Sequence, residues 1–345
     1  MTCNDTTCEL PPPSSEMELE TNTAEIVIKG TPIRVPATRI QGRTVILNGR
    51  TIRIASIHDE DWDAEPVSDP SSITRALRKG ALKADIFTFS QKLPATKPQF
   101  DYPFEWENLA VVSITTFKEW WENRLPQESR KNVRRSGRRG VVVRSVSFGD
   151  ELVRGIKPIY DETPFRQGRR FWHYGKDLQT LKQQHGTYLD RADFIGAFFQ
   201  EELIGFIKLV QVGNACSIMQ IVSRNSHYDK RPANALLAKA VEICEQRRVS
   251  WLIYGQYIYG KSDDAPLTEF KRRNGFEQVL LPRYYVPLTA WGHVCVKTKL
   301  HLGLRRLLPK KVDAGLLKLR SKLYGLRQPG SPAAPVERAE ANRDS

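Results

Sequence analysis

The stretch "ADFIGAFFQEELIGFIKLVQVGNACSIMQIVS" (192–223), continued by "RNSHYDKRPANALLAKAVEICEQRRVSWLIYG" (224–255), decides the fold of this chain. Its first half holds three apolar runs separated by short polar turns, a pattern typical of consecutive antiparallel strands. In its second half, apolar residues recur at helical spacing over 232–248, and the apolar strand "WLIYG" follows. Three strands, a helix and a further strand predict a mixed sheet in which the helix connects two parallel neighbours.

The flanking segments extend this pattern in both directions. Upstream, hydrophobic periodicity predicts helices over 115–140, 149–162 and 176–186 and a strand over 141–146; downstream, it predicts a short helix over 267–274 and two strands over 276–281 and 283–288. We therefore expect an α/β (α+β) fold: a mixed, mostly antiparallel sheet flanked by helices.

The rest of the chain divides by composition. Residues 25–108 are β-rich, and Asn48-Gly49 between two alternating apolar runs predicts a tight hairpin. The principal domain is expected over 109–292. Residues 1–24 and 328–345 have the composition of a disordered leader and tail, and 293–327 predicts two basic amphipathic helices divided by Pro309.

Positive charge is concentrated in two places. The net charge is +14 with a pI near 9.6. Residues 130–144 carry seven Lys or Arg and no carboxylate, while 294–327 carry ten against Asp313 alone. Local basic patches indicate an anionic partner such as nucleic acid or a membrane surface, although a solvated face or a docking helix gives the same pattern.

Cysteine, histidine and hydropathy patterns exclude several classes. The five cysteines form no C-x-x-C pair, and the six histidines show no metal spacing, so we expect reduced thiols and no metal. The first 18 residues lack the charge and apolar core of a secretory signal, and no apolar run approaches the ~20 residues of a membrane span. The expected location is the cytoplasm, with peripheral attachment to the inner membrane as an alternative.

Two motifs and the order of elements resemble a known superfamily. The order over 109–290, with "FKRRNGFE" (270–277) before the last strands, resembles the GNAT acyltransferase fold. The basic helix "RKNVRRSGRRGVVVR" (130–144) before the first strand is similar to the FemAB-like branch, which includes the BioF2-like acyltransferases. The resemblance implies an acyl or aminoacyl transferase. The glycine-containing Q/R-x-x-G-x-G/A loop of acetyl-CoA enzymes is replaced by "HYDKRPANALL" (227–237), which leaves the donor open.

An anion site is predicted where the helix at 232 begins. Proline costs nothing at the first helical position, and the free amides there carry partial positive charge. Two cations precede this helix start, and small residues let a phosphate approach the backbone. The resemblance adds a main-chain oxyanion donor near 220–223. We therefore assign acyl-CoA or a phosphopantetheine carrier to Ile221, Ser223, Lys230, Arg231, Ala233, Asn234 and Ala235; the alternative is a surface helix whose cations point to water.

Acyl transfer to an amine needs a base and an acid. The candidates are His227 or Glu162 as base and Tyr257 or Tyr259 as acid. Each has a structural alternative: Glu162 as an exposed helix end, the tyrosines as one face of a core strand.

Arginines and aromatic residues alternate in "TPFRQGRRFWHYGKD" (163–177). Aromatic faces and guanidinium groups suit a sugar or a phosphorylated acceptor, by stacking and bidentate contacts, although a loop packed over the sheet fits equally. The acceptor residues we select are Arg166, Arg169, Trp172, His173 and Tyr174.

Together these features predict an N-acyltransferase. Its donor would be acyl-CoA or an acyl carrier protein, and its acceptor an amine-bearing small molecule or glycan precursor of the cell envelope. One alternative is an aminoacyl-tRNA-dependent transferase, in which the basic patches bind tRNA. The other is a binding module that keeps the fold without catalysis.

Overall fold

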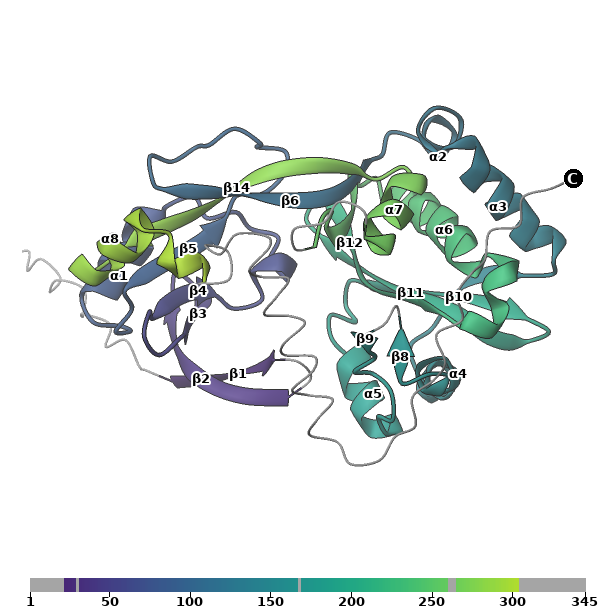
Figure 1. The fold of residues 1–345 in the computed structure, drawn as a ribbon, viewed down its shortest axis with the longest axis horizontal. Helices are drawn as coiled ribbons and strands as arrows, with labels where there is room; N and C mark the ends of the chain where they lie inside the picture. The colour runs from purple at the N-terminus through teal and green to yellow at the C-terminus, as the bar shows by residue number, and fades with distance from the viewer. Residues whose placement is uncertain (1–21, 29–30, 167–168, 260–264, 304–345) are drawn as a thin grey trace, which may run out of the picture. The chain divides into compact units, whose positions relative to one another are not determined.

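The computed structural model describes residues 22–28, 31–166, 169–259 and 265–303. Twelve strands form one sheet in the order β1-β2-β3-β4-β5-β14-β6-β13-β12-β11-β10-β7 (Figure 1). The expected mixed, mostly antiparallel sheet flanked by helices is confirmed, since only β4/β5 and β12/β13 pair in parallel in the described sheet. The predicted leader and tail lie outside the described residues, apart from the first strand residues from Asn22.

The N-terminal region supplies five strands and one helix. These are β1 (Asn22–Ile28), β2 (Thr31–Ile40), β3 (Arg43–Asn48), β4 (Ile54–Ile57), the 3-10 turn η1 (Glu60–Trp62), α1 (Pro70–Arg78) and β5 (Ile86–Ser90). The expected β3/β4 hairpin is present, but its loop spans five residues because Asn48 pairs with Ile54. The tight turn lies one hairpin earlier, at Gln41 and Gly42, which both have positive φ.

The meander quoted above folds as expected. Its strands are β10 (Ala192–Phe199), β11 (Glu202–Val212) and β12 (Ala215–Ser223), and the helix α6 (Pro232–Gln246) leads to β13 (Trp251–Gln256). Gln200 and Glu201 form the two-residue turn between β10 and β11, both with positive φ. The edge strand β7 (Val142–Val146) completes this side of the sheet by pairing with β10.

Helices cover both faces of this part of the sheet (Figure 1). On one face lie α3 (Gln127–Arg138) and α6, and on the other lie α4 (Asp150–Asp161) and α5 (Leu178–His185). The apolar stripe of α6 is buried against the sheet as its periodicity predicted, in a core that includes Leu236, Leu237, Ala240, Val241 and Cys244. A second core joins α4 to Phe206 and Val222 on the opposite face.

Short elements form the connections between these strands and helices. They are α2 (Phe117–Glu119), the π-helix η2 (Trp120–Arg124), β8 (Phe165–Arg166), β9 (Arg169–Arg170) and the 3-10 turn η3 (Asn225–Lys230).

The last strand joins the N-terminal strands to the rest of the sheet by pairing. Instead of two strands, residues 277–287 form one continuous strand, β14, which pairs with β5 on one side and β6 (Phe104–Ser113) on the other. The predicted division at residues 108 and 109 falls inside β6, which pairs with both β14 and β13. The short helix before β14 is α7 (Pro266–Arg273).

The end of the described chain holds α8 (Ala290–Lys297) and the 3-10 turn η4 (Leu300–Leu302). The first compact unit of the chain ends at Val294, and the residues from Cys295 belong to a second. Most of the predicted basic amphipathic segment lies outside the described residues.

Candidate functional site

Strands β12 and β13 part inside the sheet. They pair at Ala215↔Trp251, Cys216↔Leu252 and Ser217↔Ile253, and their ladder ends there. Just beyond, β12 carries a bulge at Met219, because Leu209 and Lys208 of β11 pair with Ile218 and Gln220. Main-chain N–H and C=O groups that lose a ladder neighbour need another partner. The two diverging edges therefore form a gap that can bind an extended, amide-containing ligand.

A buried lysine borders this gap. Lys271 on α7 has no exposed surface, and its ammonium donates a hydrogen bond to the Gln256 carbonyl at the end of β13. The same ammonium lies 4.5 Å from the ring centre of Tyr254 and 4.6 Å from that of Tyr259. No carboxylate pairs with it among the described residues. Burial lowers the pKa of Lys271 to about 8.

The tyrosines after β13 have different surroundings. The Tyr259 hydroxyl lies close to Gly255, where an added Cβ would meet it at 2.5 Å. Burial raises the pKa of Tyr259, opposed by a hydrogen bond from the Gln256 backbone. Tyr257 packs partly against the α6 core, and its carbonyl accepts from Thr268. Tyr259 is thus the nearer of the two predicted acids to Lys271.

A cavity of about 310 Å³ opens on the sheet where the two strands part. Ile218 and Ile253 line it from the diverging strands, together with Gly255 and Gln256. Its other wall comes from the N-terminal region, mainly η1 and the end of β5. The cavity therefore reaches the same Gln256 whose carbonyl binds Lys271.

Ion pairs fix the N-terminal wall of this cavity. The Arg283 guanidinium on β14 donates to Glu60 at 2.9 Å and to Glu107 at 2.6 Å. Ser90 joins both carboxylates, through its amide to Glu60 at 2.6 Å and its hydroxyl to Glu107 at 2.9 Å. Burial raises the pKa of Glu60, while the charge of Arg283 opposes this shift.

At the predicted anion site, where α6 begins, some of the backbone amides are already hydrogen-bonded. Arg231 is the N-cap of α6 with φ 55°, and its carbonyl accepts from the Asn234 amide at 3.2 Å. Ala235 is the fourth helical residue, whose amide donates to the N-cap carbonyl in a regular helix. Of the assigned residues Ala233, Asn234 and Ala235, only Ala233 therefore keeps a free amide, which corrects the expectation that the amides at this helix start are all free. The Asn234 side chain is also engaged, since it donates to Asn274 at 2.8 Å.

The two cations of this site lie on aromatic rings. The Lys230 ammonium is 4.6 Å from the centre of the Phe199 ring, and the Arg231 guanidinium is 4.8 Å from that of Tyr228. Asp229 pairs with Lys230 at 3.6 Å and with Arg139 of the basic helix at 3.1 Å. Ile221 and Ser223 lie on β12 beyond its last pair with β13.

Glu162 holds the turn before α6. Its carboxylate accepts from the amides of Asn225 at 2.6 Å and Ser226 at 2.9 Å, and from the Ser226 hydroxyl at 2.7 Å. Arg166 adds an ion pair at 3.4 Å. Burial raises the pKa of Glu162, but these hydrogen bonds outweigh it and hold the pKa below its usual value. Its lone pairs are thus largely occupied.

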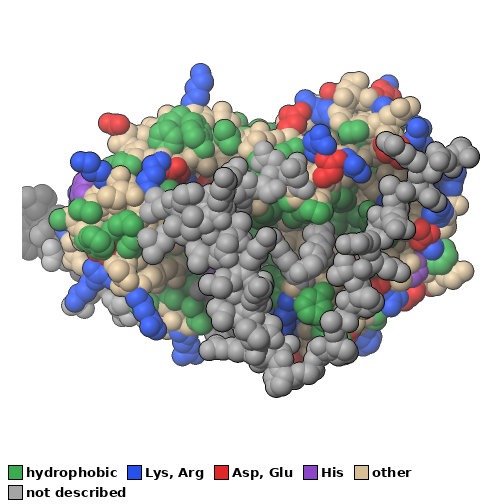
Figure 2. Space-filling view, in the orientation of Figure 1, with side chains coloured by type: hydrophobic (Ala, Val, Ile, Leu, Met, Phe, Trp, Pro, Cys, Tyr) green, Lys and Arg blue, Asp and Glu red, His purple; other side chains and the backbone are tan. Residues whose placement is uncertain are grey.

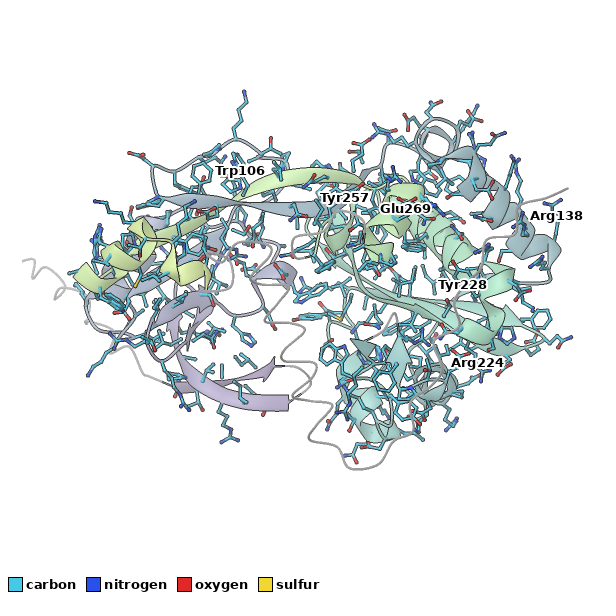
Figure 3. All side chains as sticks on the ribbon, viewed as in Figure 1. Trp106, Arg138, Arg224, Tyr228, Tyr257 and Glu269 are labelled. Atoms are coloured by element: carbon cyan, nitrogen blue, oxygen red, sulfur yellow. The ribbon has the colours of Figure 1, made fainter. Side chains whose placement is uncertain are left out.

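His227 lies in the same turn, with Nδ1 3.1 Å from the Ser226 hydroxyl and its ring 5.8 Å from Phe199. Figure 3 labels its neighbour Tyr228 on another part of the domain from Tyr257, whose carbonyl accepts from Thr268 of α7. None of the four predicted bases and acids lines the cavity within the described part of the chain. The predicted bases lie at the turn before α6, and the predicted acids lie beside α7.

The aromatic segment contains both buried and exposed side chains. Trp172 and Tyr174 are about half exposed, at 53% and 46%. His173 packs 4.6 Å from the Tyr160 ring centre, and burial lowers its pKa to about 4. Arg166 donates to the Ser223 carbonyl at 2.9 Å, which links the segment to the end of β12. Arg169 begins β9, and its side chain is outside the described set.

Sequence reasoning missed Lys271. Helical spacing places it on the same face as Leu267 and Asn274, where an apolar residue is normal, and this was the available signal. Lys208 in the apolar run of β11 gives a similar signal, and it is also fully buried. Its ammonium, however, is satisfied by the His185 carbonyl and by the carbonyl and hydroxyl of Thr187.

Comparison with solved structures identifies the fold, whereas comparison of sequences identifies no family. No protein-family model matches the chain, and no curated protein matches it. Among solved structures, FemX is similar with a TM-score of 0.52 and 10% identity, over 76% of this chain and 88% of FemX. L-PGS from Bacillus licheniformis has a TM-score of 0.47 and 14% identity, over 75% and 86% of the two chains. A tandem GNAT protein from the clavulanic acid biosynthesis pathway has a TM-score of 0.40 and 12% identity, over 74% and 83%.

The likeness to FemX confirms the fold that the sequence resemblance implied, the FemAB-like form of the GNAT fold. Within the described ranges, no helix is long and apolar enough to cross a membrane, and no group of three His, Cys, Asp or Glu could hold a metal.

Proposed function

We propose that this protein is a transferase that moves an acyl or aminoacyl group from an activated carrier to an amine. The observation that carries the proposal is the gap between β12 and β13, with the unpaired ammonium of Lys271 at its edge. A buried cation without an anion is costly unless the site needs a positive charge. Such a charge suits the oxyanion that forms when an amine adds to a carbonyl.

The chemistry follows from these positions. The neutral amine attacks the carbonyl carbon, a C–N bond forms, and the C–S or C–O bond to the carrier breaks. Lys271 stabilises the tetrahedral oxyanion, together with a main-chain amide beside the bulge at Met219. Burial keeps the Tyr259 phenol protonated at neutral pH, so it can give its proton to the leaving group. The proton that the amine loses restores the phenol.

For the donor we propose a thioester on CoA or on an acyl carrier protein. The free strand edges can pair with the two amides of a phosphopantetheine arm, and the Ala233 amide at the start of α6 suits its phosphate. Lys230 and Arg231 would leave Phe199 and Tyr228 to pair with that phosphate. In this proposal Glu162 positions the turn that carries these cations. Neither Glu162 nor His227 serves as the base, because the Tyr259 phenolate takes the proton of the amine.

A donor-binding experiment tests the proposal. The purified protein is titrated with acetyl-CoA, palmitoyl-CoA and free CoA while its melting temperature is followed, and native mass spectrometry is used to detect a bound carrier. A donor at 100 times its Kd stabilises the fold by about 2.7 kcal/mol, which shifts the midpoint by several degrees. Failure of every thioester to shift the midpoint would refute the thioester donor.

Aminoacyl-tRNA is the second candidate donor, favoured by the basic face of α3. Lys131, Arg134 and Arg138 are exposed there, and Figure 2 shows Lys and Arg side chains along this edge. Arg134→Glu combined with Arg138→Glu should abolish tRNA binding if this face contacts RNA phosphates. Wild-type affinity should also fall steeply as salt rises. Unchanged binding in the double variant would exclude this face.

We further propose an amine on a cell-envelope or glycan precursor as the acceptor. The segment with Arg166, Arg169, Trp172, His173 and Tyr174 would contact the rest of that precursor, away from its reacting amine. Cytoplasmic placement with peripheral membrane contact belongs to the same proposal. Sedimentation with vesicles that contain phosphatidylglycerol tests the membrane contact.

A further inference from the structure

The cavity beside the strand gap contains one carboxylate without a hydrogen bond or ion pair among the described residues. Three acids, Glu60, Asp61 and Glu107, line it against two cations, Lys92 and Arg283. Glu60 and Glu107 share Arg283, whereas Asp61 has no hydrogen bond or ion pair among the described residues. The cavity thus has one negative charge in excess, on an exposed side chain.

Neither cation of the lining is available to an anionic ligand. The Lys92 ammonium donates to the Glu60 carbonyl at 2.9 Å and to the Asp63 carbonyl. Arg283 lies between its two carboxylates, with only 17% of its side chain exposed. A ligand entering the cavity therefore meets a free anion and no free cation.

The remaining lining is mostly apolar. Leu109, Ile218, Ile253 and Leu281 contribute aliphatic surface, and Trp62 and Trp251 contribute aromatic surface. Trp62 is held in place, because it stacks on Tyr188 with ring centres 5.7 Å apart. Aliphatic and indole surface around one carboxylate matches a ligand with an apolar ring or chain and a protonated amino group.

We propose that this cavity is the acceptor site, and that Asp61 selects acceptors with a cationic amino group. The assignment of the ligand as an acceptor rests on the proposed transfer function. It is supported by position, because Gly255 and Gln256 line the cavity and also border Lys271 and Tyr259. An amine held there lies next to the gap in which the carbonyl would be presented. Asp61 acts as a counter-ion that positions the acceptor as an ammonium ion, and the amine gives one proton to solvent water before its neutral form attacks the carbonyl.

The test uses three probes of one shape and different charge: benzylamine, benzyl alcohol and benzoate. Dissociation constants are measured by ligand-observed NMR on the full chain, without any donor. Wild type is expected to bind benzylamine up to about fivefold more tightly than benzyl alcohol, since a solvent-accessible ion pair contributes that much. Benzoate is expected to bind most weakly.

Substitutions at position 61 test whether the Asp61 carboxylate causes the preference for benzylamine. Asp61→Asn should make benzylamine and benzyl alcohol equal, and Asp61→Lys should reverse the order in favour of benzoate. The matched control is Asp101→Asn, which removes another exposed aspartate that does not line the cavity and should leave the preference unchanged. Because Asp61 is exposed, these substitutions are compatible with folding, which melting curves verify.

The inference is wrong if the wild-type protein binds benzyl alcohol or benzoate more tightly than benzylamine. It is also wrong if the Asp61→Asn variant keeps the preference for benzylamine. Its failure is distinguishable from failure of the proposed function, because the donor titration contains no acceptor. Thioester binding without amine selectivity refutes the acceptor site alone. Amine selectivity without thioester or tRNA binding keeps the cation site and refutes the transferase.

Discussion

Replacing Lys271 with Met should make the protein more stable and much less active. The pKa of Lys271 falls from 10.5 to about 8 because its ammonium is buried. Each pKa unit corresponds to about 1.4 kcal/mol, so holding the charge in the fold costs about 3 kcal/mol at pH 7. Losing the hydrogen bond to Gln256 returns about 1 kcal/mol. The variant should therefore gain about 2 kcal/mol at pH 7.

The sign of the pH dependence is specific to a lowered lysine pKa. Below pH 8 both folded and unfolded chains hold the proton, and the full cost is present. Between pH 8 and 10.5 the unfolded chain binds more protons than the folded one, so wild-type stability rises with pH. The advantage of Lys271→Met should accordingly shrink from pH 7 to pH 10. Urea unfolding at both pH values measures it through the midpoint at constant m-value.

Activity should change in the opposite direction. Removing one oxyanion donor typically costs 10²–10³ in turnover, so amide formation from the donor that binds should fall by about that factor. Lys271→Arg retains a charge but puts a larger guanidinium beside the rings of Tyr254 and Tyr259, and we expect that it does not rescue the rate. The reasoning is refuted if Lys271→Met is less stable than wild type at pH 7, or if it keeps full activity.

Three further substitutions test other parts of the structure. Lys208→Met should keep activity within about twofold and gain no stability, because three acceptors around this buried lysine lose their donor; a gain like that of Lys271→Met would contradict this. Glu162→Gln should cost about 1–2 kcal/mol at pH 7 and weaken donor binding, and its effect should vanish as pH falls through the lowered pKa of Glu162; an undiminished difference in acid would argue against the carboxylate clamp. Tyr188→Phe breaks a 2.7 Å hydrogen bond to Asp59 and should cost about 1 kcal/mol in urea unfolding while loosening benzylamine binding, whereas unchanged binding would separate this contact from the cavity wall.

The strand order over 192–256 could be predicted because local signals agree there. Apolar runs of strand length, a polar two-residue turn and a helix with one apolar face each specify the same connection. The hairpin at Asn48-Gly49 shows the limit of such signals. The strands pair as predicted, but Gly49 begins a five-residue loop, since pairing across the sheet sets the register.

The candidate site was only partly predictable. The sequence directed attention to His227, Lys230 and the start of α6, since a basic loop before Pro232 is a local pattern. The structure shows that the Asn234 amide is not available to an anion there. Arg231 adopts a left-handed conformation, and its carbonyl accepts the hydrogen bond of that amide. Whether an N-terminal amide is free depends on the turn before it, which composition does not specify.

The sequence by itself determined the succession of strands and helices, the superfamily resemblance and the location of basic charge, because these depend on residues close together in the chain. The tertiary structure alone decided which charges are buried and which are unpaired. Arg283 pairs with Glu60 across 223 residues of sequence, whereas the adjacent Asp61 has no hydrogen bond or ion pair among the described residues. Burial and pairing are properties of contacts between distant segments. They alone distinguish Lys271, which donates to one carbonyl, from Lys208, which donates to three oxygen acceptors.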